Sequence, residues 1–150
     1  MKLEEEIKQD KGFRDQYHKT FINIVYTAAA IKLKAKKTLK AHGISVEQYN
    51  VLRILRGQHP KTISVKLIQE RMLDKSFNAS RLVERLRENG LVARHESKVD
   101  RRKVEVFITK KGLKLLADAD QDVDNQHNVL RFIPEENLEV LNEILDRLRE

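Results

Sequence analysis

The sequence predicts a mainly α-helical protein with one small β-hairpin. Composition favours helices, because 35% of the 150 residues are charged while only five are glycine and two are proline. Periodicity agrees: apolar residues recur every three or four positions along most of the chain and at every second position only over residues 91–96 and 104–108. A chain of this length is expected to form a single domain, residues 1–150.

Charge and cysteine content limit the classes of function that this protein can have. The absence of cysteine excludes disulfides, thiolate zinc sites and cysteine nucleophiles. The formal net charge of +7 is divided into +7 over residues 1–65, +5 over 66–103 and −5 over 104–150. The basic front and acidic tail indicate a polyanionic partner for the middle of the chain and a different role for its end. The apolar stretch 21–31 is too short to span a bilayer and no secretion signal is visible, so a cytoplasmic location without membrane contact is expected.

A long helix is predicted from about residue 13 to residue 39, and Gly43 ends it in the left-handed conformation that often terminates helices. Two apolar stripes run along it. They comprise Phe13, Tyr17, Phe21, Ile24, Ala28, Ile31, Ala35 and Leu39 in the first, and Ile22, Val25, Ala29 and Leu33 in the second. Two stripes exceed what one neighbouring surface needs, so the helix is expected to be deeply buried or to form a subunit interface.

Two shorter helices are predicted next. Ser45 and Gln48 form a capping box for the first, whose pattern is lost from Gly57 onward. Ser64 is expected to cap the second, which runs to about Met72. Two short helices in succession therefore precede a third.

The third helix has a polar and basic outer face. Asp74 or Ser76 is expected to cap its start, and Asn89-Gly90 ends it, with Leu91 packing on Leu86 in a Schellman closure. The apolar stripe, Ala79, Leu82, Val83 and Leu86, faces inward. The outer face then holds Phe77, Arg81 and Glu84, flanked by Asn78, Ser80 and Arg85.

A basic hairpin and two helices complete the chain. The tip between the two strands, residues 97–103, contains four basic residues and one aspartate. Thr109 is expected to open a helix with apolar positions as far as Leu130, and Pro134 to start a last helix. The stripe of this last helix is Leu138, Leu141, Leu145 and Leu148.

Asp120, Asp124 and His127 fall on one helix face, and carboxylates with an imidazole are ligands for zinc or manganese. A solvated acidic face is the preferred interpretation, because no nearby fourth ligand is visible. No metal site and no cofactor are assigned, and whether these three residues bind a metal is left open.

This order of elements is that of a winged helix-turn-helix over residues 45–109. A helix fits the major groove of DNA, where each base pair has a distinct pattern of donors, acceptors and methyl groups. Arginines at a hairpin tip suit the narrow, negative minor groove, and Asp100 is expected to hold a neighbouring arginine by a bidentate pair. The predicted DNA-binding residues are Ser76, Phe77, Asn78, Ser80, Arg81, Arg85, Lys98, Asp100, Arg101 and Arg102.

Nearly the whole chain also resembles the MarR family of bacterial regulators. The resemblance is strongest in Ile63–Met72, in Asn78–Arg94, and in Asp100-Arg101-Arg102 followed by Ile108-Thr109-Lys110-Lys111-Gly112. It implies a homodimeric winged-helix regulator of transcription, with dimerisation helices in residues 10–43 and 110–150. It also implies release of DNA when a small, often aromatic or anionic, effector binds between the two domains. Without cysteine, oxidant sensing through a thiol is excluded.

The predicted function is sequence-specific binding of double-stranded DNA by a homodimeric repressor, at a pseudo-palindromic operator. The alternative is a winged-helix module that binds a partner protein, or a structural dimer without specific DNA reading. An enzyme is not expected, because the chain has no Gly-rich phosphate loop, no nucleophile motif and no His-Glu-x-x-His. The acidic run Glu4–Glu6 lies in a terminus expected to lack fixed structure.

Overall fold

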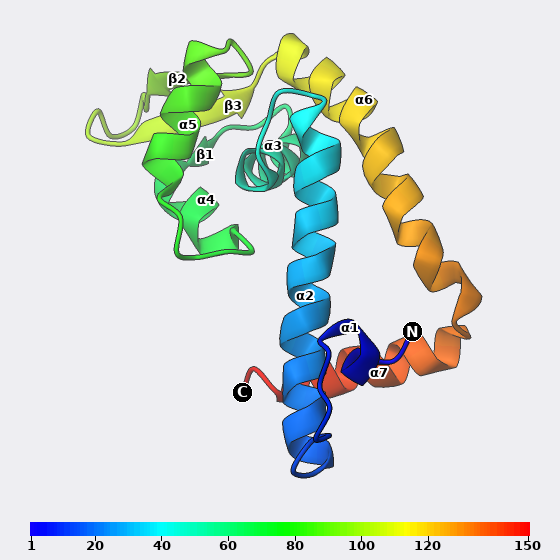
Figure 1. The fold of residues 1–150 in the computed structure, drawn as a ribbon. Coiled ribbons are helices and arrows are strands. Elements are labelled where there is room, and N and C mark those ends of the chain that lie inside the picture. Colours follow the sequence, from blue (N-terminus) through cyan, green and yellow to red (C-terminus); the bar gives the residue numbers. More distant parts are fainter. The chain divides into compact units, whose positions relative to one another are not determined.

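The computed structural model describes all of residues 1–150, which form two compact units, residues 1–46 and 47–150 (Figure 1). Most of the chain is helical, with one small antiparallel sheet, as the sequence predicts. No helix combines the length and the apolar character that crossing a membrane requires.

The first unit consists of a short helix, α1 (Leu3–Glu6), and a long helix, α2 (Gln16–Lys40). Helix α2 begins after Asp15, whose side chain accepts a hydrogen bond from the backbone N–H of His18 at 2.7 Å. The prediction of an unstructured terminus is wrong: Leu3 is buried, and Lys19 donates a hydrogen bond to Glu4 Oε1 at 2.5 Å. Gly43 has a φ of +71°, the left-handed conformation predicted for it.

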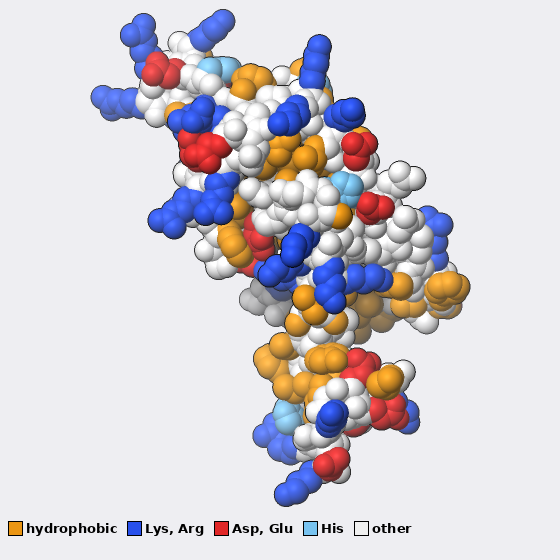
Figure 2. Space-filling model, turned by 45° about the horizontal axis from the view of Figure 1, so that its top comes forward, with side chains coloured by type: hydrophobic (Ala, Val, Ile, Leu, Met, Phe, Trp, Pro, Cys, Tyr) orange, Lys and Arg blue, Asp and Glu red, His pale blue; other side chains and the backbone are white.

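The apolar stripes of α2 are largely exposed. Tyr17 is 87% exposed, and Leu39 is the one buried residue of this helix. The other large hydrophobic side chains of α2 that are exposed are Phe21, Val25, Tyr26, Ile31 and Leu33. Figure 2 shows hydrophobic side chains gathered in exposed clusters among Lys and Arg side chains that project from the surface. The expectation of a deeply buried helix is therefore wrong, while a subunit interface stays a prediction.

The second unit begins with three helices, α3 (Val46–Gln58), α4 (Val65–Arg71) and α5 (Ala79–Glu88). Ser64 caps α4 by accepting a hydrogen bond from the N–H of Leu67 at 3.2 Å, as predicted. The end of α5 is the predicted Schellman closure, with hydrogen bonds from Leu91 N–H to Leu86 at 2.9 Å and from Gly90 N–H to Arg87 at 2.9 Å. The start of α4 and the end of α5 therefore lie where their local sequence predicts them.

The three-stranded antiparallel sheet has the order β1-β3-β2, formed by β1 (Ile63–Ser64), β3 (Val104–Ile108) and β2 (Val92–Glu96). Val92 pairs with Ile108, and Ile63 pairs with Val106. Strand β1 is not predicted by the sequence, because two residues are too few to show an alternating pattern. The core of this unit is apolar and includes Val51, Leu52, Leu55, Ile68, Val83, Leu86, Val92 and Val106.

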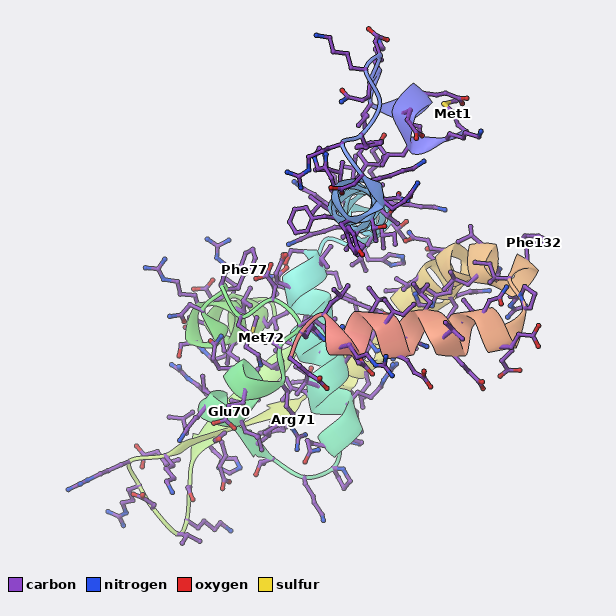
Figure 3. The ribbon with its side chains drawn as sticks, turned by 90° about the horizontal axis from the view of Figure 1, so that it is seen from below. Met1, Glu70, Arg71, Met72, Phe77 and Phe132 are labelled. Atoms are coloured by element: carbon purple, nitrogen blue, oxygen red, sulfur yellow. The ribbon has the colours of Figure 1, made fainter.

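The chain ends with α6 (Lys110–His127), the 3-10 helix η1 (Asn128–Phe132) and α7 (Glu135–Arg147). Helix α6 stops at His127, short of the predicted Leu130, and the chain continues as η1. Phe132 lies at the bend between α6 and α7 (Figure 3) and is exposed. No residue of α7 is buried. The last twenty residues therefore present apolar side chains that this chain leaves uncovered.

Candidate nucleic-acid interface

Helix α5 presents unpaired cations on its outer face. Ser80, Arg81 and Arg85 are exposed, and no ion pair of the chain includes either arginine. These two guanidinium groups lie about one turn apart on the helix, so both point away from the buried stripe.

The start of α5 corrects the predicted cap. Asn78 is the N-cap, and its Oδ1 accepts a hydrogen bond from the backbone N–H of Arg81 at 3.1 Å. Ser76 and Asp74 instead form a turn of their own, in which the N–H of Ser76 donates to Asp74 Oδ1 at 3.1 Å and the Ser76 hydroxyl donates to the same oxygen. Ser76 therefore lies in the loop before α5, not at its cap.

Gln69 of α4 holds the start of α5 in place, a role that the sequence does not reveal. Its Oε1 accepts a hydrogen bond from the N–H of Ala79 at 2.8 Å, and its Nε2 donates to the carbonyl oxygen of Phe77 at 2.9 Å. The other end of the loop is tied to α3, because the N–H of Leu73 donates to Asn50 Oδ1 at 3.0 Å. Two amide side chains thus fix the turn of the helix-turn-helix.

The hairpin tip is an ordered loop with four exposed cations, Lys98, Arg101, Arg102 and Lys103. Ser97 is buried, and its Oγ accepts hydrogen bonds from the N–H groups of Val99 at 3.3 Å and Asp100 at 3.4 Å. The N–H of Ser97 closes the loop by donating to the carbonyl of Lys103 at 2.9 Å. The loop is therefore held from inside while its cations face outward.

Asp100 acts on the backbone of the tip, which corrects its predicted role. Its Oδ1 accepts a hydrogen bond from the N–H of Arg102 at 3.0 Å, and its Oδ2 lies 4.0 Å from the ammonium of Lys103. It forms no bidentate pair with an arginine side chain. Asp100 therefore shapes the turn that presents Arg101 and Arg102, and leaves both guanidinium groups unpaired.

Glu84 links α5 to the hairpin. Its carboxylate accepts a hydrogen bond at 2.6 Å from Nη2 of Arg87, on the same helix, and lies 3.0 Å from Nη1 of Arg94 on β2. The hydrogen bond from Arg87 lowers the pKa of Glu84, and the nearby charge of Arg94 acts in the same direction. Glu84 is therefore part of a bridge between helix and hairpin, not of the free outer face where the sequence places it.

The start of α6 is packed against the end of α5. Thr109 caps α6 by accepting from the N–H of Gly112 at 3.1 Å, as predicted, and its hydroxyl donates to the carbonyl of Gly90 at 2.7 Å. Lys111 Nζ donates to the carbonyl of Asn89 at 2.8 Å. A Cβ atom at Gly112 would overlap the carbonyl oxygen of Leu91. The Thr-x-x-Gly motif is thus a close contact that only glycine allows.

Asp120 joins α6 to α3. The Tyr49 hydroxyl donates to Asp120 Oδ1 at 2.6 Å, and Arg56 Nη1 contacts Asp120 Oδ2. Burial raises the pKa of Asp120, but the hydrogen bonds from Arg56 and Tyr49 outweigh it, so the net pKa is lowered. Burial, followed by the hydrogen bond to Asp120, raises the pKa of Tyr49 to about 12.

The Asp120 carboxylate is thus bound by Tyr49 and Arg56, while Nδ1 of His127 lies 3.7 Å from Oδ1 of Asp124. No group of three His, Asp or Glu side chains in the structure is arranged to hold a metal ion. Asp120 therefore has a structural role in joining two helices, and of the three candidate metal ligands only Asp124 and His127 lie close to each other.

Known proteins share both sequence and fold with this chain. Residues 42–103 match the model of the MarR family. The transcriptional repressor MprA of Escherichia coli (strain K12) is 29% identical over 132 residues, which are 83% of this chain and 73% of MprA. The crystal structure of a MarR transcription factor from Planctomyces limnophilus is 29% identical, covers 90% of this chain and 98% of its own, and superposes with a TM-score of 0.68.

A second solved structure resembles the chain in fold alone. It is the transcriptional repressor CouR bound to a 23-mer DNA duplex, with a TM-score of 0.73 at 18% identity, over 85% of this chain and 90% of CouR. The family match falls on the helix-turn-helix and the hairpin, and the likeness to whole regulators extends over most of the remaining helices. The chain is thus similar to the MarR family model over residues 42–103 and, over most of its length, to a transcriptional repressor and a MarR transcription factor.

Proposed function

We propose that the protein represses transcription by binding a pseudo-palindromic operator in double-stranded DNA as a homodimer. The observation that supports this most directly is the set of cations without partners on two adjoining parts of one winged helix. Arg81 and Arg85 lie on α5, and Lys98, Arg101 and Arg102 lie on the hairpin tip. Phosphates and guanine edges are the groups that such cations bind in a duplex.

In this proposal residues 45–109 read the DNA. Helix α5 enters the major groove with Phe77, Asn78, Ser80, Arg81 and Arg85, and Ser76 contacts a phosphate from the loop before it. The hairpin places Arg101 and Arg102 over the minor groove, with Lys98 beside them and Asp100 fixing the turn. The DNA-bound state of CouR supports the same use of this fold.

Residues 10–43 and 110–150 form the dimer interface in this proposal. Each of these segments exposes apolar side chains that a single chain leaves in contact with water. Those of the second segment are Val129, Leu130, Phe132, Ile133, Val140, Leu141, Ile144 and Leu148. A two-fold dimer would bury both faces and present two α5 helices about 34 Å apart, one turn of DNA.

A small molecule, aromatic or anionic, is proposed to release the operator. This part rests on what the resemblance to the MarR family implies. It is tested by thermal stability of the protein with a panel of aromatic acids, followed by DNA binding in the presence of any compound that stabilises it.

The proposed function is tested by DNA binding of Arg81→Ala at several salt concentrations, on a duplex selected from random sequences by the wild-type protein. A guanidinium at this position is expected to contribute about 1–3 kcal/mol through a bidentate guanine contact, so the variant should lose affinity and lose preference at one base per half-site. Wild-type affinity should fall steeply with salt. A flat salt response, or equal affinity for all duplexes, would contradict the proposal and favour a module that binds a partner protein.

A further inference from the structure

Two large apolar side chains are exposed in the turn between α4 and α5, which leads into the helix that the proposed function places in the major groove. Leu73 is 89% exposed at the start of this turn, and Phe77 is 38% exposed at its end, two residues before α5. Figure 3 shows Phe77 on the loop that leads into α5 and Met72 at the end of α4. Of the two apolar residues, Phe77 is next to the helix that presents Ser80 and Arg81.

The backbone that presents Phe77 is fixed on both sides. Its carbonyl oxygen accepts the hydrogen bond from Gln69 Nε2 at 2.9 Å, and Asn78, the next residue, is the N-cap of α5. The following N–H, of Ala79, is held by the same glutamine at 2.8 Å. A side chain with two rotatable bonds on a backbone held this way loses little conformational entropy on binding.

A benzyl side chain is selective among bases because it offers no hydrogen bond. In the major groove, guanine, adenine and cytosine present donors or acceptors, whereas thymine also presents a C5 methyl group, for which apolar contact is favourable. Placing Phe77 against an exocyclic amine would leave that amine without a partner. Ser80 and Arg81, on the first turn of α5, have polar tips that can hydrogen-bond to such donors and acceptors.

We propose that Phe77 selects thymine at one position of each operator half-site, by packing its ring on the thymine C5 methyl group. This inference rests on the proposed DNA-binding function and adds a base preference to it. Gln69 acts here as a positioning residue, since it orients the backbone on both sides of the Phe77 ring without touching DNA.

The test replaces each thymine of a selected duplex, one at a time, by deoxyuridine, which removes only the methyl group. At one thymine per half-site, wild-type affinity should fall about fourfold, the equivalent of one buried methyl group, and replacements elsewhere should have little effect. In Phe77→Ala the same replacement should leave affinity unchanged, although the variant binds the thymine duplex more weakly than wild type does.

Leu73→Ala is the matched control, because it removes an exposed apolar side chain from the same turn and should keep the wild-type response to deoxyuridine. Phe77→Ala should also keep the wild-type salt slope, which reports intact phosphate contacts and separates lost base reading from misfolding. If wild type binds selectively and with steep salt dependence but tolerates deoxyuridine at every position, the thymine proposal is overturned while the DNA-binding function stands. If wild type shows no selective binding, the function itself fails.

Discussion

Gly112→Ala separates two opposing predictions about the same residue. Gly112 lies in the first turn of α6 with a helical backbone, so propensity alone predicts that alanine stabilises the protein by about 1 kcal/mol. The structure predicts the opposite. A Cβ atom there would overlap the carbonyl oxygen of Leu91 and lie 2.8 Å from Cγ1 of Ile108, where ordinary contact begins at 3.4 Å.

The expected change in the free energy of unfolding follows from the groups that the added Cβ atom would displace. The carbonyl oxygen of Leu91 and Cγ1 of Ile108 both lie too close to the added Cβ atom. The start of α6 must therefore shift away from Leu91, which directly follows the end of α5. This shift weakens the hydrogen bonds from the Thr109 hydroxyl to Gly90 at 2.7 Å and from the Thr109 N–H to Leu91 at 3.1 Å. Two hydrogen bonds of about 1 kcal/mol each and an overpacking cost of about 1–3 kcal/mol exceed the helix gain, so a net loss of about 2–4 kcal/mol is expected.

The assay is urea unfolding at one fixed protein concentration, followed by circular dichroism. Gly57→Ala is the matched control, because Gly57 is also helical and a Cβ atom there would meet nothing within 4 Å. Gly57→Ala should raise the unfolding midpoint and Gly112→Ala should lower it. An unfolding midpoint for Gly112→Ala at or above that of wild type would refute the steric reasoning.

Three further predictions concern the interface, the hairpin and the pH response. Leu141→Glu places a carboxylate on the exposed apolar stripe of α7, where it would be buried without a partner in the proposed dimer. Light scattering should then give a monomer of 17.6 kDa in place of a dimer, while circular dichroism still shows a helical protein. A wild-type protein that is itself monomeric would contradict the proposed interface. Asp100→Ala removes a negative charge yet should weaken DNA binding, because it frees the Arg102 backbone; affinity equal to or above that of wild type would mean that the tip acts through charge alone. Asp120→Asn tests linkage: because the pKa of Asp120 is lower in the folded protein than in the unfolded chain, its carboxylate stabilises the fold above the ordinary carboxyl pKa, near 4. This contribution is lost as pH falls from that value through the lowered pKa. The variant should therefore be less stable than wild type at neutral pH and approach it in acid, and a stability difference that does not change with pH would count against the Asp120 ion pair.

Local signals explain which parts of the fold are visible in the sequence. The Schellman closure at Gly90 and the caps at Ser64 and Thr109 depend only on residues within one turn of each other, so their positions are correctly predicted. Strand β1 has two residues and exists because it pairs with β3, a partner some forty residues away. Such pairing leaves no periodic trace in the chain.

The errors at the site have the same origin. Asp74, Ser76 and Asn78 are all good capping residues within five positions, and composition cannot rank them. The contacts of Gln69 with Phe77 and Ala79 decide the choice, and these come from another helix. The sequence predicts that Asp100 holds an arginine side chain, whereas it accepts a hydrogen bond from the Arg102 backbone. The shape of the hairpin turn decides between the two, and the residue pattern does not specify that shape.

Helix α6 is joined to the winged helix at two separated places, and this limits how it can move. Its first turn is locked to the end of α5 through Thr109, Lys111 and the close approach at Gly112. Further along, Asp120 is bonded to Tyr49 and Arg56 of α3, the helix to which Asn50 ties the turn before α5. A displacement of α6 must therefore either break these contacts or move α5 and the hairpin with it, because close-packed groups have no slack to absorb the shift. The link between α6 and α5 is thus built largely from hydrogen bonds, and the effect of removing each one can be measured.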